Sequence, residues 1–399
     1  MSGERAGDAL VVLICSGGAA WELPLVRGMQ RRELGVVIAR RCVDHGELVG
    51  TALRDRPRAV LVDASMAWVD RDLVVTLRRA GVEVFAVGNS ERPLAEIGVR
   101  CVDADATAEA VAGALHRLEA PASISVASVA MERATTGHVV AVWGGAGSPG
   151  RTTFAVQLAV EAAAGGTSTL LIDADVWAAC VAQLLSLNES PSIAQAARSA
   201  ADGWPSPLTE SLQAGPHGLQ VLAGLARAEL WPEIREEAWR AVLSMARTSF
   251  ELVVVDIGAS IEEDEELAFD RVPYRRNLVT TTTLDHADDI VLVTGADPVS
   301  LRRAVVAHRT LTERQTGGGV NTRTAARLDI VLNRVPRAGR RLQDCSRAVN
   351  EWMGSVPMAM LPEEPAFDRT VWEGRPLRDV APRSPWLREL RPLIAELSS

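Results

Sequence analysis

A glycine-rich segment between a buried-strand pattern and a helical pattern is the feature of this sequence most able to do chemistry. Residues 145–153 read GAGSPGRTT, with the apolar run 139–143 before them and the helical run 154–164 after them. The spacing GxxxxG, followed by a basic residue and a hydroxyl, turns backbone N–H groups toward phosphate oxygens at a helix N-terminus. Because strand, loop and helix stand in the required order, the segment predicts a phosphate-binding loop.

Four further landmarks follow the loop. The run 170–175 (LLIDAD) ends in two acids, and the run 252–258 (LVVVDIG) carries an acid two positions before a glycine. An apolar strand at 328–334 ends in Asn-Arg, and residues 361–377 begin with LPEEPAFD and end with EGRPL.

These five landmarks, in this order, resemble the MinD/ParA family of P-loop ATPases over roughly residues 138–397. A receiver-like domain ahead of such an ATPase domain resembles the CpaE/TadZ branch, which positions Flp/Tad pilus assembly machinery. The resemblance implies ATP or ADP with Mg²⁺ as cofactors and an ATP-dependent homodimer. It also implies a protein partner complex, with pilus or secretion machinery at the inner membrane as the candidate.

The resemblance implies a role for each landmark residue. The loop would cradle the phosphates, Asp173 and Asp175 would position the attacking water, and Asp256 would hold Mg²⁺ through a water. The expected nucleotide-binding residues are Gly145, Gly147, Ser148, Gly150, Arg151, Thr152, Thr153, Gly258 beside the γ-phosphate, and Asn333, Arg334 and Pro362 around the base. The expected metal ligands are Thr152, Asp173 and Asp256, and the expected catalytic residues are Asp173, Asp175 and Arg151. The alternative for each acid is a helix cap at a strand-to-helix junction.

The loop departs from the family pattern at three positions. Ala146 stands where the family has a lysine that reaches across a dimer, and Arg151 replaces the lysine before the threonine pair. The guanidinium keeps the charge but is wider than an ammonium, and Pro149 removes one backbone N–H donor. The sequence contains no lysine at all. We expect weakened nucleotide binding and slow or absent hydrolysis, because such cations act on charge that develops in the transition state.

The elements that must position these residues alternate along the chain. In residues 9–118, buried-strand runs alternate with helical patterns, which predicts a parallel sheet covered on both faces, in the flavodoxin-like doubly wound order. The predicted strands are 9–15, 36–39, 59–62, 83–87 and 99–102, and the predicted helices are 22–32, 45–54, 70–80 and 106–118. From residue 137 onward we expect an α/β P-loop NTPase (SIMIBI/MinD-like) domain with a mostly parallel sheet.

The first half resembles a response-regulator receiver domain in its architecture only. Asp63, at the end of the third predicted strand, matches the phospho-acceptor position. The acidic pair expected after the first strand reads Ser16-Gly17, and the place of the lysine expected after the fifth reads Asp103-Ala104. A metal would have too few ligands here, so we expect a pseudo-receiver used for docking, in which Asp63 is not phosphorylated.

Three segments complete the organisation of the chain. Residues 119–136 are rich in Ala, Ser and Thr with little periodicity, which predicts a linker between a domain of residues 1–118 and one of residues 137–399. The pattern of residues 261–276 predicts a solvated helix. The alternative is a switch segment in which Arg275 and Arg276 contact phosphate or a partner protein. The amphipathic stretch 386–394 is expected to pack against the core rather than to bind lipid.

Composition narrows the classes of function. The net charge of -9 disfavours a general attraction to DNA or anionic lipid, so we expect neither sequence-specific nucleic-acid binding nor direct membrane insertion. The scattered cysteines disfavour a zinc site or a disulfide framework. Without a secretory signal or a long apolar span, the protein is expected in the cytoplasm, recruited to the membrane only through a partner.

Two functions of different classes fit this pattern. The first is a nucleotide-dependent spatial organiser, a weak P-loop ATPase that dimerises with ATP and places a partner complex in the cell. A ParA-like chromosome or septum positioning factor is a variant of this function. The second is a non-enzymatic pseudo-ATPase scaffold. A P-loop ligase or kinase of related fold is a third possibility, which the receiver-like domain disfavours.

Overall fold

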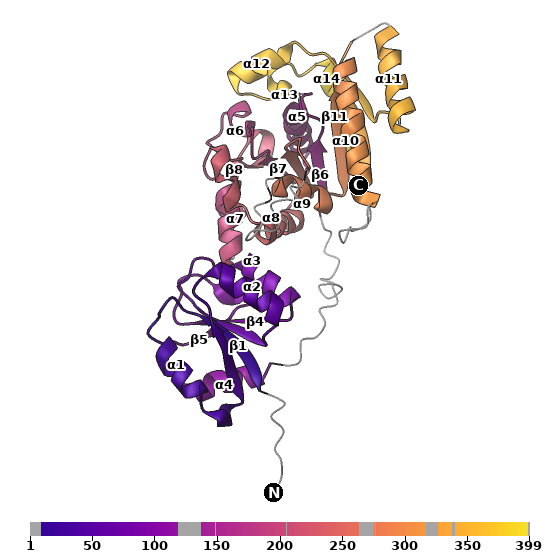
Figure 1. Ribbon diagram of the computed structural model, residues 1–399. Helices are drawn as coiled ribbons and strands as arrows, with labels where there is room; N and C mark the ends of the chain where they lie inside the picture. Colours follow the sequence, from indigo (N-terminus) through magenta and orange to yellow (C-terminus); the bar gives the residue numbers. More distant parts are fainter. Residues whose placement is uncertain are drawn as a thin grey trace. The chain divides into compact units, whose positions relative to one another are not determined.

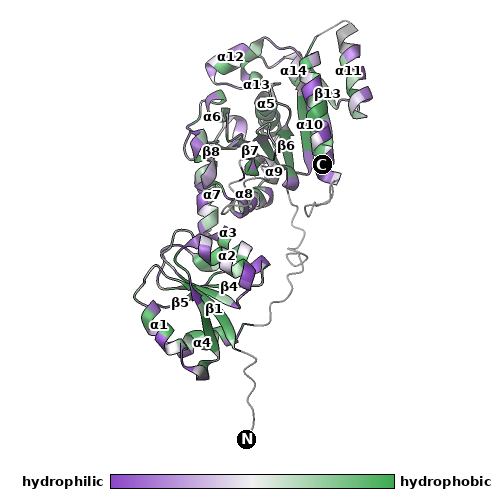
Figure 2. Ribbon diagram, viewed as in Figure 1, coloured by the Kyte–Doolittle hydropathy of each residue, from purple (hydrophilic) through white to green (hydrophobic). Residues whose placement is uncertain are grey.

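The computed structural model describes residues 9–118, 137–147, 149–204, 206–262, 275, 277–316, 326–336 and 340–397. They form two compact units, one made of residues 9–118 and the other of most residues from 137 onward (Figure 1). In both units the strands are the most hydrophobic elements (Figure 2). No helix in the described ranges is long and apolar enough to cross a lipid bilayer. The predicted linker, 119–136, lies outside the described residues.

A parallel sheet with helices on both faces makes up the first unit. Within residues 9–118, five strands lie in the order β2-β1-β3-β4-β5. Since side chains alternate across a strand, Leu13 and Val60 pack with α2 and α3, whereas Val12 and Leu61 pack with α1 and α4 on the other face. The elements are β1 Leu10–Cys15, α1 Glu22–Met29, β2 Val36–Arg41, α2 His45–Asp55, β3 Ala59–Asp63, α3 Arg71–Arg79, β4 Glu83–Val87, β5 Arg100–Val102 and α4 Ala108–His116, with short 3₁₀ turns at Arg32–Leu34 and Leu94–Ile97.

The ends of these elements differ from the sequence prediction by a few residues. Helix α1 ends at Met29 rather than at residue 32, where a separate 3₁₀ turn begins. Asp70 precedes α3 as its N-cap, because its carboxylate accepts a hydrogen bond from Leu73 N at 3.0 Å. A polar side chain that satisfies an otherwise free N–H group at a helix start does not itself take the helical conformation.

The second unit is built on a larger and mostly parallel sheet. In its described residues, eight strands lie in the order β13-β12-β11-β6-β10-β7-β9-β8, and β8 alone is antiparallel to its neighbour. The strands are β6 His138–Trp143, β7 Thr169–Ala174, β8 Gln213–Ala214, β9 Gln220–Leu222, β10 Leu252–Ile257, β11 Asp289–Gly295, β12 Arg327–Val335 and β13 Ala359–Pro362. The helices are α5 Arg151–Ala164, α6 Val181–Leu184, α7 Ile193–Asp202, α8 Glu236–Ser249, α9 Leu278–His286, α10 Pro298–Thr316, α11 Arg340–Met353, α12 Ala366–Glu373, α13 Leu377–Val380 and α14 Pro385–Glu396, with 3₁₀ turns at Thr209–Ser211, Pro216–Gly218 and Ala228–Glu233.

Helix α5, which follows the glycine-rich loop, is held by the C-terminal helices. Gln157 Oε1 accepts a hydrogen bond from Leu377 N at 2.9 Å. The buried carboxylate of Glu161 pairs with Arg378 at 2.9 Å and with Arg391 at 2.7 Å. Helix α14 packs Trp386, Leu387, Leu390 and Leu393 into the same core. The prediction that residues 386–394 pack against the core is therefore confirmed.

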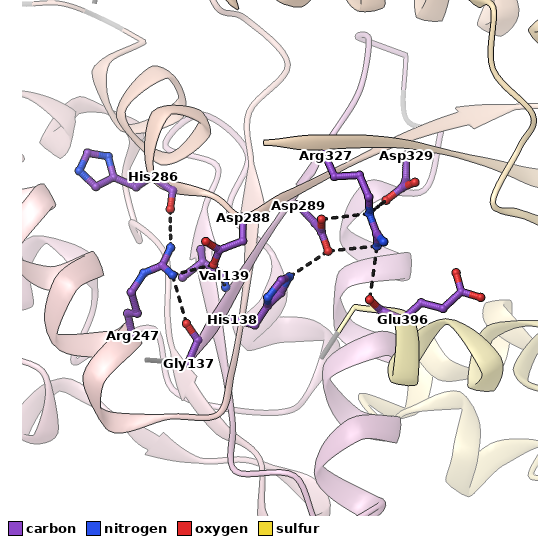
Figure 3. A network of polar contacts seen from close by, with 10 residues as sticks. All are labelled: Gly137, His138, Val139, Arg247, His286, Asp288, Asp289, Arg327, Asp329 and Glu396. Atoms are coloured by element: carbon purple, nitrogen blue, oxygen red, sulfur yellow. Dashed lines mark hydrogen bonds and ion pairs between the residues drawn. The ribbon is translucent and has the colours of Figure 1, made fainter. Parts of the chain in front are cut away.

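An ionic network joins the amino ends of the central strands (Figure 3). Asp289, at the start of β11, pairs with His138 of β6 at 2.9 Å and with Arg327 of β12 at 3.1 Å. Arg247 of α8 pairs with Asp288 at 2.7 Å and donates a hydrogen bond to the carbonyl of Gly137 at 3.2 Å. These contacts fix the point at which the chain enters the second unit, at the end of the sheet opposite to the glycine-rich loop.

Candidate functional site

The candidate site lies at the carboxyl ends of β6, β10 and β7. The glycine-rich loop follows Trp143 at the end of β6, and β10 lies between β6 and β7. The strand register places Asp256 of β10 directly opposite Asp173 of β7. Ligands of open α/β sheets bind at the carboxyl edge of the strands, where the strand order reverses. Asp173 and Asp256, about 80 positions apart in the sequence, therefore lie side by side at one edge of the sheet, as expected for a site formed by several strands.

The backbone of the glycine-rich loop leads directly into the N-terminus of α5, which faces the interior of the loop. Gly150 is the N-cap of α5 with φ +94°, and among the described residues no side chain caps this end. A Cβ atom at Gly150 would come within 2.3 Å of Asn333 Nδ2, so only glycine fits. The first N–H groups of a helix have no partner within it and attract anions. Ser148, expected to bind phosphate, lies outside the described residues.

Arg151 does not extend into open space from the loop. Its guanidinium donates a hydrogen bond to the carbonyl of Gly144 at 2.8 Å and pairs with Asp175 at 3.5 Å. The cation expected to contact phosphate thus binds one of the expected catalytic acids. Because Asp175 also accepts hydrogen bonds from the N–H groups of Trp177 and Ala178, it stabilises a turn as well.

Asp173 and Asp256 are almost completely buried, and each keeps one oxygen without a partner. Asp173 Oδ2 accepts from the N–H groups of Cys180 and Val181, both at 2.9 Å, so the helix-cap alternative holds for this oxygen. Its Oδ1, like Oδ1 of Asp256, has no hydrogen-bond partner in the described part of the chain. Burial raises the pKa of Asp173 to about 6 and raises the pKa of Asp256 well above its usual value.

The partnerless oxygens fit a magnesium ion held mainly by phosphate and water. Burial raises the pKa of Asp256, and a hydrogen bond from Thr152 offsets part of that rise, which places the hydroxyl of Thr152 at this carboxylate. The described residues contain no cluster of three His, Cys, Asp or Glu side chains able to hold a metal by themselves. Mg²⁺ commonly takes only one or two carboxylates and fills its shell with water and substrate phosphates. Thr152, Asp173 and Asp256 are thus suited to hold Mg²⁺ together with a nucleotide.

The remaining expected residues are distributed around the loop. Gly258 lies beside Asp175, because a Cβ atom there would be 3.3 Å from Asp175 Oδ1. Gly145 and Gly147 form the first half of the loop, and Thr153 lies in the first turn of α5. Pro362 is the last residue of β13, two strands away from β11.

Asn333 has an internal role that the sequence prediction did not include. Its Nδ2 donates to the carbonyl of Pro149 at 3.0 Å, and its Oδ1 accepts from Trp386 Nε1 at 3.1 Å. The buried amide therefore connects the phosphate loop to α14. Arg334, next along the strand, is exposed and has φ +56°, a conformation that is uncommon outside glycine.

Two further groups at the site were missed by the sequence prediction. Arg303 of α10 donates to the carbonyl of Ala146 at 3.1 Å. Cys180 lies close to the buried acids, and burial together with the charges of Asp173 and Asp256 raises its pKa to about 11. No spacing motif indicates either residue, since both come from elements whose position depends on strand order.

In the first unit, Asp63 is surrounded by donors from its own fold. Its Oδ2 accepts from Trp21 Nε1 at 2.8 Å and its Oδ1 from Ser65 N at 2.9 Å. Burial alone would raise the pKa of Asp63, but these hydrogen bonds leave it below its usual value. Glu22 is a buried acid after β1 that the sequence prediction overlooked; it is hydrogen-bonded to Ser16 and paired with Arg41.

Only part of the segment 261–276 can be placed. Arg275 pairs with Glu236 of α8 at 2.9 Å, so its described contact is with protein. Arg276 and residues 263–274 lie outside the described residues, and the choice between a solvated helix and a switch segment stays a prediction.

No family model matches the sequence. An uncharacterized ATP-binding protein of Methanocaldococcus jannaschii is 22% identical over 261 residues, which are 65% of this chain and 86% of that protein. The similarity is too low to assign the chain to a family.

Solved structures of related fold are MinD and ParA proteins. A ParA family ATPase from Chlorobium tepidum has a TM-score of 0.54 at 19% identity, over 65% of this chain and 98% of that chain. The cell division ATPase MinD of Pyrococcus furiosus has a TM-score of 0.52 at 18% identity, over 65% and 98%. The septum site-determining protein MinD of Pyrococcus horikoshii, complexed with Mg-ADP, has a TM-score of 0.51 at 17% identity, over 65% and 96%. The structural neighbours are thus MinD/ParA-family ATPases, and the expected α/β fold with a mostly parallel sheet is confirmed.

Proposed function

We propose that the second unit binds ATP or ADP together with Mg²⁺. The observation that carries this proposal is the pair of buried carboxylates, Asp173 and Asp256, each with one oxygen to which no described residue donates a hydrogen bond. An unpaired buried carboxylate is costly unless a cation or a hydrogen-bond donor compensates it. A cation at these oxygens would lie next to Thr152 and the uncapped start of α5, where phosphate binds favourably.

We further propose that hydrolysis is weak or absent. Arg151 is paired with Asp175, and Ala146 and Pro149 offer neither the charge nor the N–H donor of an intact loop. A catalytic acid that shares its charge with an arginine is less available to orient water. Nucleotide binding without fast hydrolysis suits a protein whose conformation depends on the bound nucleotide. It does not suit a metabolic enzyme, which must convert its substrate quickly.

For the whole chain, we propose a cytoplasmic spatial organiser of the CpaE/TadZ kind. It forms an ATP-dependent homodimer and positions a partner complex, with pilus or secretion machinery as the candidate. The strand order β2-β1-β3-β4-β5 supports a flavodoxin-like, receiver-like first unit, because it is the order of doubly wound folds of that kind. The hydrogen bonds from Trp21 and Ser65 to Asp63 support a docking role without phosphorylation.

Calorimetric titration of the full chain with ATP and ADP, with and without Mg²⁺, tests the proposal. We expect magnesium-dependent binding in the micromolar range or weaker, and phosphate release below about 1 per second, near the low end for enzymes. Asp256→Asn should remove the magnesium dependence while leaving the fold intact. Absence of heat at millimolar nucleotide, with circular dichroism showing folded protein, would favour the non-enzymatic scaffold instead.

A further inference from the structure

Arg303 is a second arginine at the phosphate loop, supplied by a different element. It lies in the second turn of α10, the helix that follows β11, and β11 is the neighbour of β6 in the sheet (Figure 1). The strand order thus brings α10 to the loop that leaves β6. The side chain of Arg303 is exposed. The first arginine, Arg151, lies at the start of α5 and donates a hydrogen bond to the carbonyl of Gly144.

The contact between Arg303 and the loop is close and involves two glycines. Arg303 Nη1 donates to the carbonyl of Ala146 at 3.1 Å. A Cβ atom at Gly147 would lie 1.9 Å from Nη1, and one at Gly145 would lie 3.1 Å from the Cβ atom of Arg303. The guanidinium therefore rests against the backbone at Gly147, a position that any larger residue would block.

This contact orients a backbone donor of the loop. In a trans peptide the C=O and N–H groups point in opposite directions. The carbonyl of Ala146 faces Arg303, so the N–H group of Gly147 faces away from it. Arg151 holds the carbonyl of Gly144 in the same manner, at 2.8 Å. Two arginines from separate helices thus hold two alternate carbonyls, those of Gly144 just before the loop and of Ala146 within it.

The charge of Arg303 has a second consequence. The sequence contains no lysine, and Arg151 shares its charge with Asp175. Among the described residues, Arg303 forms no direct ion pair and donates to a backbone carbonyl, although its charge also acts on the carboxylate of Asp297. A polyphosphate bound in the loop would experience this charge directly, because opposite charges a few ångströms apart attract strongly near a protein surface.

We propose that Arg303 is a positioning residue for the phosphates of a nucleoside di- or triphosphate. It holds the loop in its phosphate-binding conformation and supplies positive charge that the loop sequence lacks. The inference rests on the proposed nucleotide binding, and it adds a residue from α10 to the site.

Fluorescence titration with an N-methylanthraniloyl derivative of ATP in Mg²⁺ buffer, using the full chain, tests the inference. Arg303→Ala should weaken binding about tenfold, the range for loss of a hydrogen bond made by a charged group. Arg303→Lys should recover part of the loss. Arg309→Ala is the matched control, since Arg309 is an exposed arginine on the same helix that pairs only with Glu313 in the described residues; it should leave affinity within about twofold.

Two further readouts separate a phosphate role from a purely structural one. Competition with AMP should be nearly unaffected by Arg303→Ala, whereas competition with ATP should weaken. The decrease of affinity with added salt should also become shallower, because one charge interaction is lost. Arg303→Met, which keeps the apolar stem, replaces the alanine variant should that variant unfold.

The outcomes are distinct from those of the proposed function. If the unaltered protein binds no nucleotide, the proposed function fails. If it binds and Arg303→Ala or Arg303→Met binds equally well, the inference is overturned while the proposed function stands. Equal loss for ATP and AMP, with no recovery in Arg303→Lys, would overturn the phosphate role of Arg303.

Discussion

At the scale of single residues, Asp256 and Asp173 show how a site can oppose the stability of its own fold. They lie opposite each other on adjacent strands, and burial raises the pKa of both. A carboxyl whose folded pKa lies above its unfolded value binds a proton more tightly in the folded state. The contribution of such a carboxyl to folding stability is therefore largest at low pH. It is lost as the pH rises from the unfolded pKa to above the folded pKa.

Asp256→Asn should stabilise the nucleotide-free protein at pH 7, because the amide keeps the shape of the side chain without its charge. The expected increase in the free energy of unfolding is on the order of 1–3 kcal/mol, the usual cost of a buried polar group left without a partner. Urea unfolding measures it, and the advantage should shrink as the pH falls through the raised pKa values of the two carboxyls, which is about 6 for Asp173.

When magnesium and nucleotide are bound, the unaltered protein should instead be more stable than Asp256→Asn. A cation at the carboxylates removes the penalty in the unaltered protein, whereas the asparagine variant has less to gain. A variant that is less stable than the unaltered protein at pH 7 without ligand would contradict the account of two destabilising buried carboxylates.

At the scale of elements, the two ends of the central strands have different roles. The carboxyl ends of β6, β7 and β10 carry the partnerless acids and the loop, and the amino ends of β6, β11 and β12 carry paired charges. The guanidinium of Arg327 also donates to the last turn of α14, at the carbonyl of Glu396, 3.3 Å away. The paired charges thus lie at the end of the sheet opposite to the buried acids of the site.

Asp289→Asn should destabilise the second unit, because Asp289 is buried and serves both His138 and Arg327. We expect a loss of about 1.5–3 kcal/mol, the usual value of a hydrogen bond to a charged group. Thermal or urea unfolding measures it. The control is Glu313→Gln on the exposed face of α10, where loss of a surface pair should change stability by less than about 0.5 kcal/mol. Equal stability of Asp289→Asn and the unaltered protein would show that the network is dispensable.

At the scale of the whole molecule, each unit has its own hydrophobic core, so the two can be separated by deletion. We predict that deleting residues 1–118 abolishes cellular localisation without unfolding the remainder. Asp63→Ala should leave localisation unchanged, because the carboxylate already serves Trp21 and Ser65. Fluorescence microscopy of tagged variants, with circular dichroism of the purified truncated chain, provides the measurement. Mislocalised Asp63→Ala, together with phosphate incorporation into the unaltered protein, would show that the receiver-like unit is active.

Patterns along the chain predicted most of the helices and strands and the position of the glycine-rich loop. A short apolar run such as 252–255 is typical of a buried strand, and a loop of glycines before a hydroxyl and a helix is typical of a phosphate-binding loop. These features depend on residues that are neighbours along the chain. For the same reason the strands in 9–118 could be predicted from their patterns, with errors of a few residues at the ends.

The contacts of the polar side chains follow from the way in which the strands and helices are assembled. Strand order placed Arg303 on the loop, paired Arg151 with Asp175, and committed Asn333 to Trp386 rather than leaving it free. It also left one oxygen each of Asp173 and Asp256 without a partner among the residues that the structure describes. The residues joined by these direct contacts lie far apart along the chain. The separation is 24 positions for Arg151 and Asp175 and 157 positions for Arg303 and Ala146. Local periodicity carries no information about such contacts, because they depend on which strands become neighbours in the sheet.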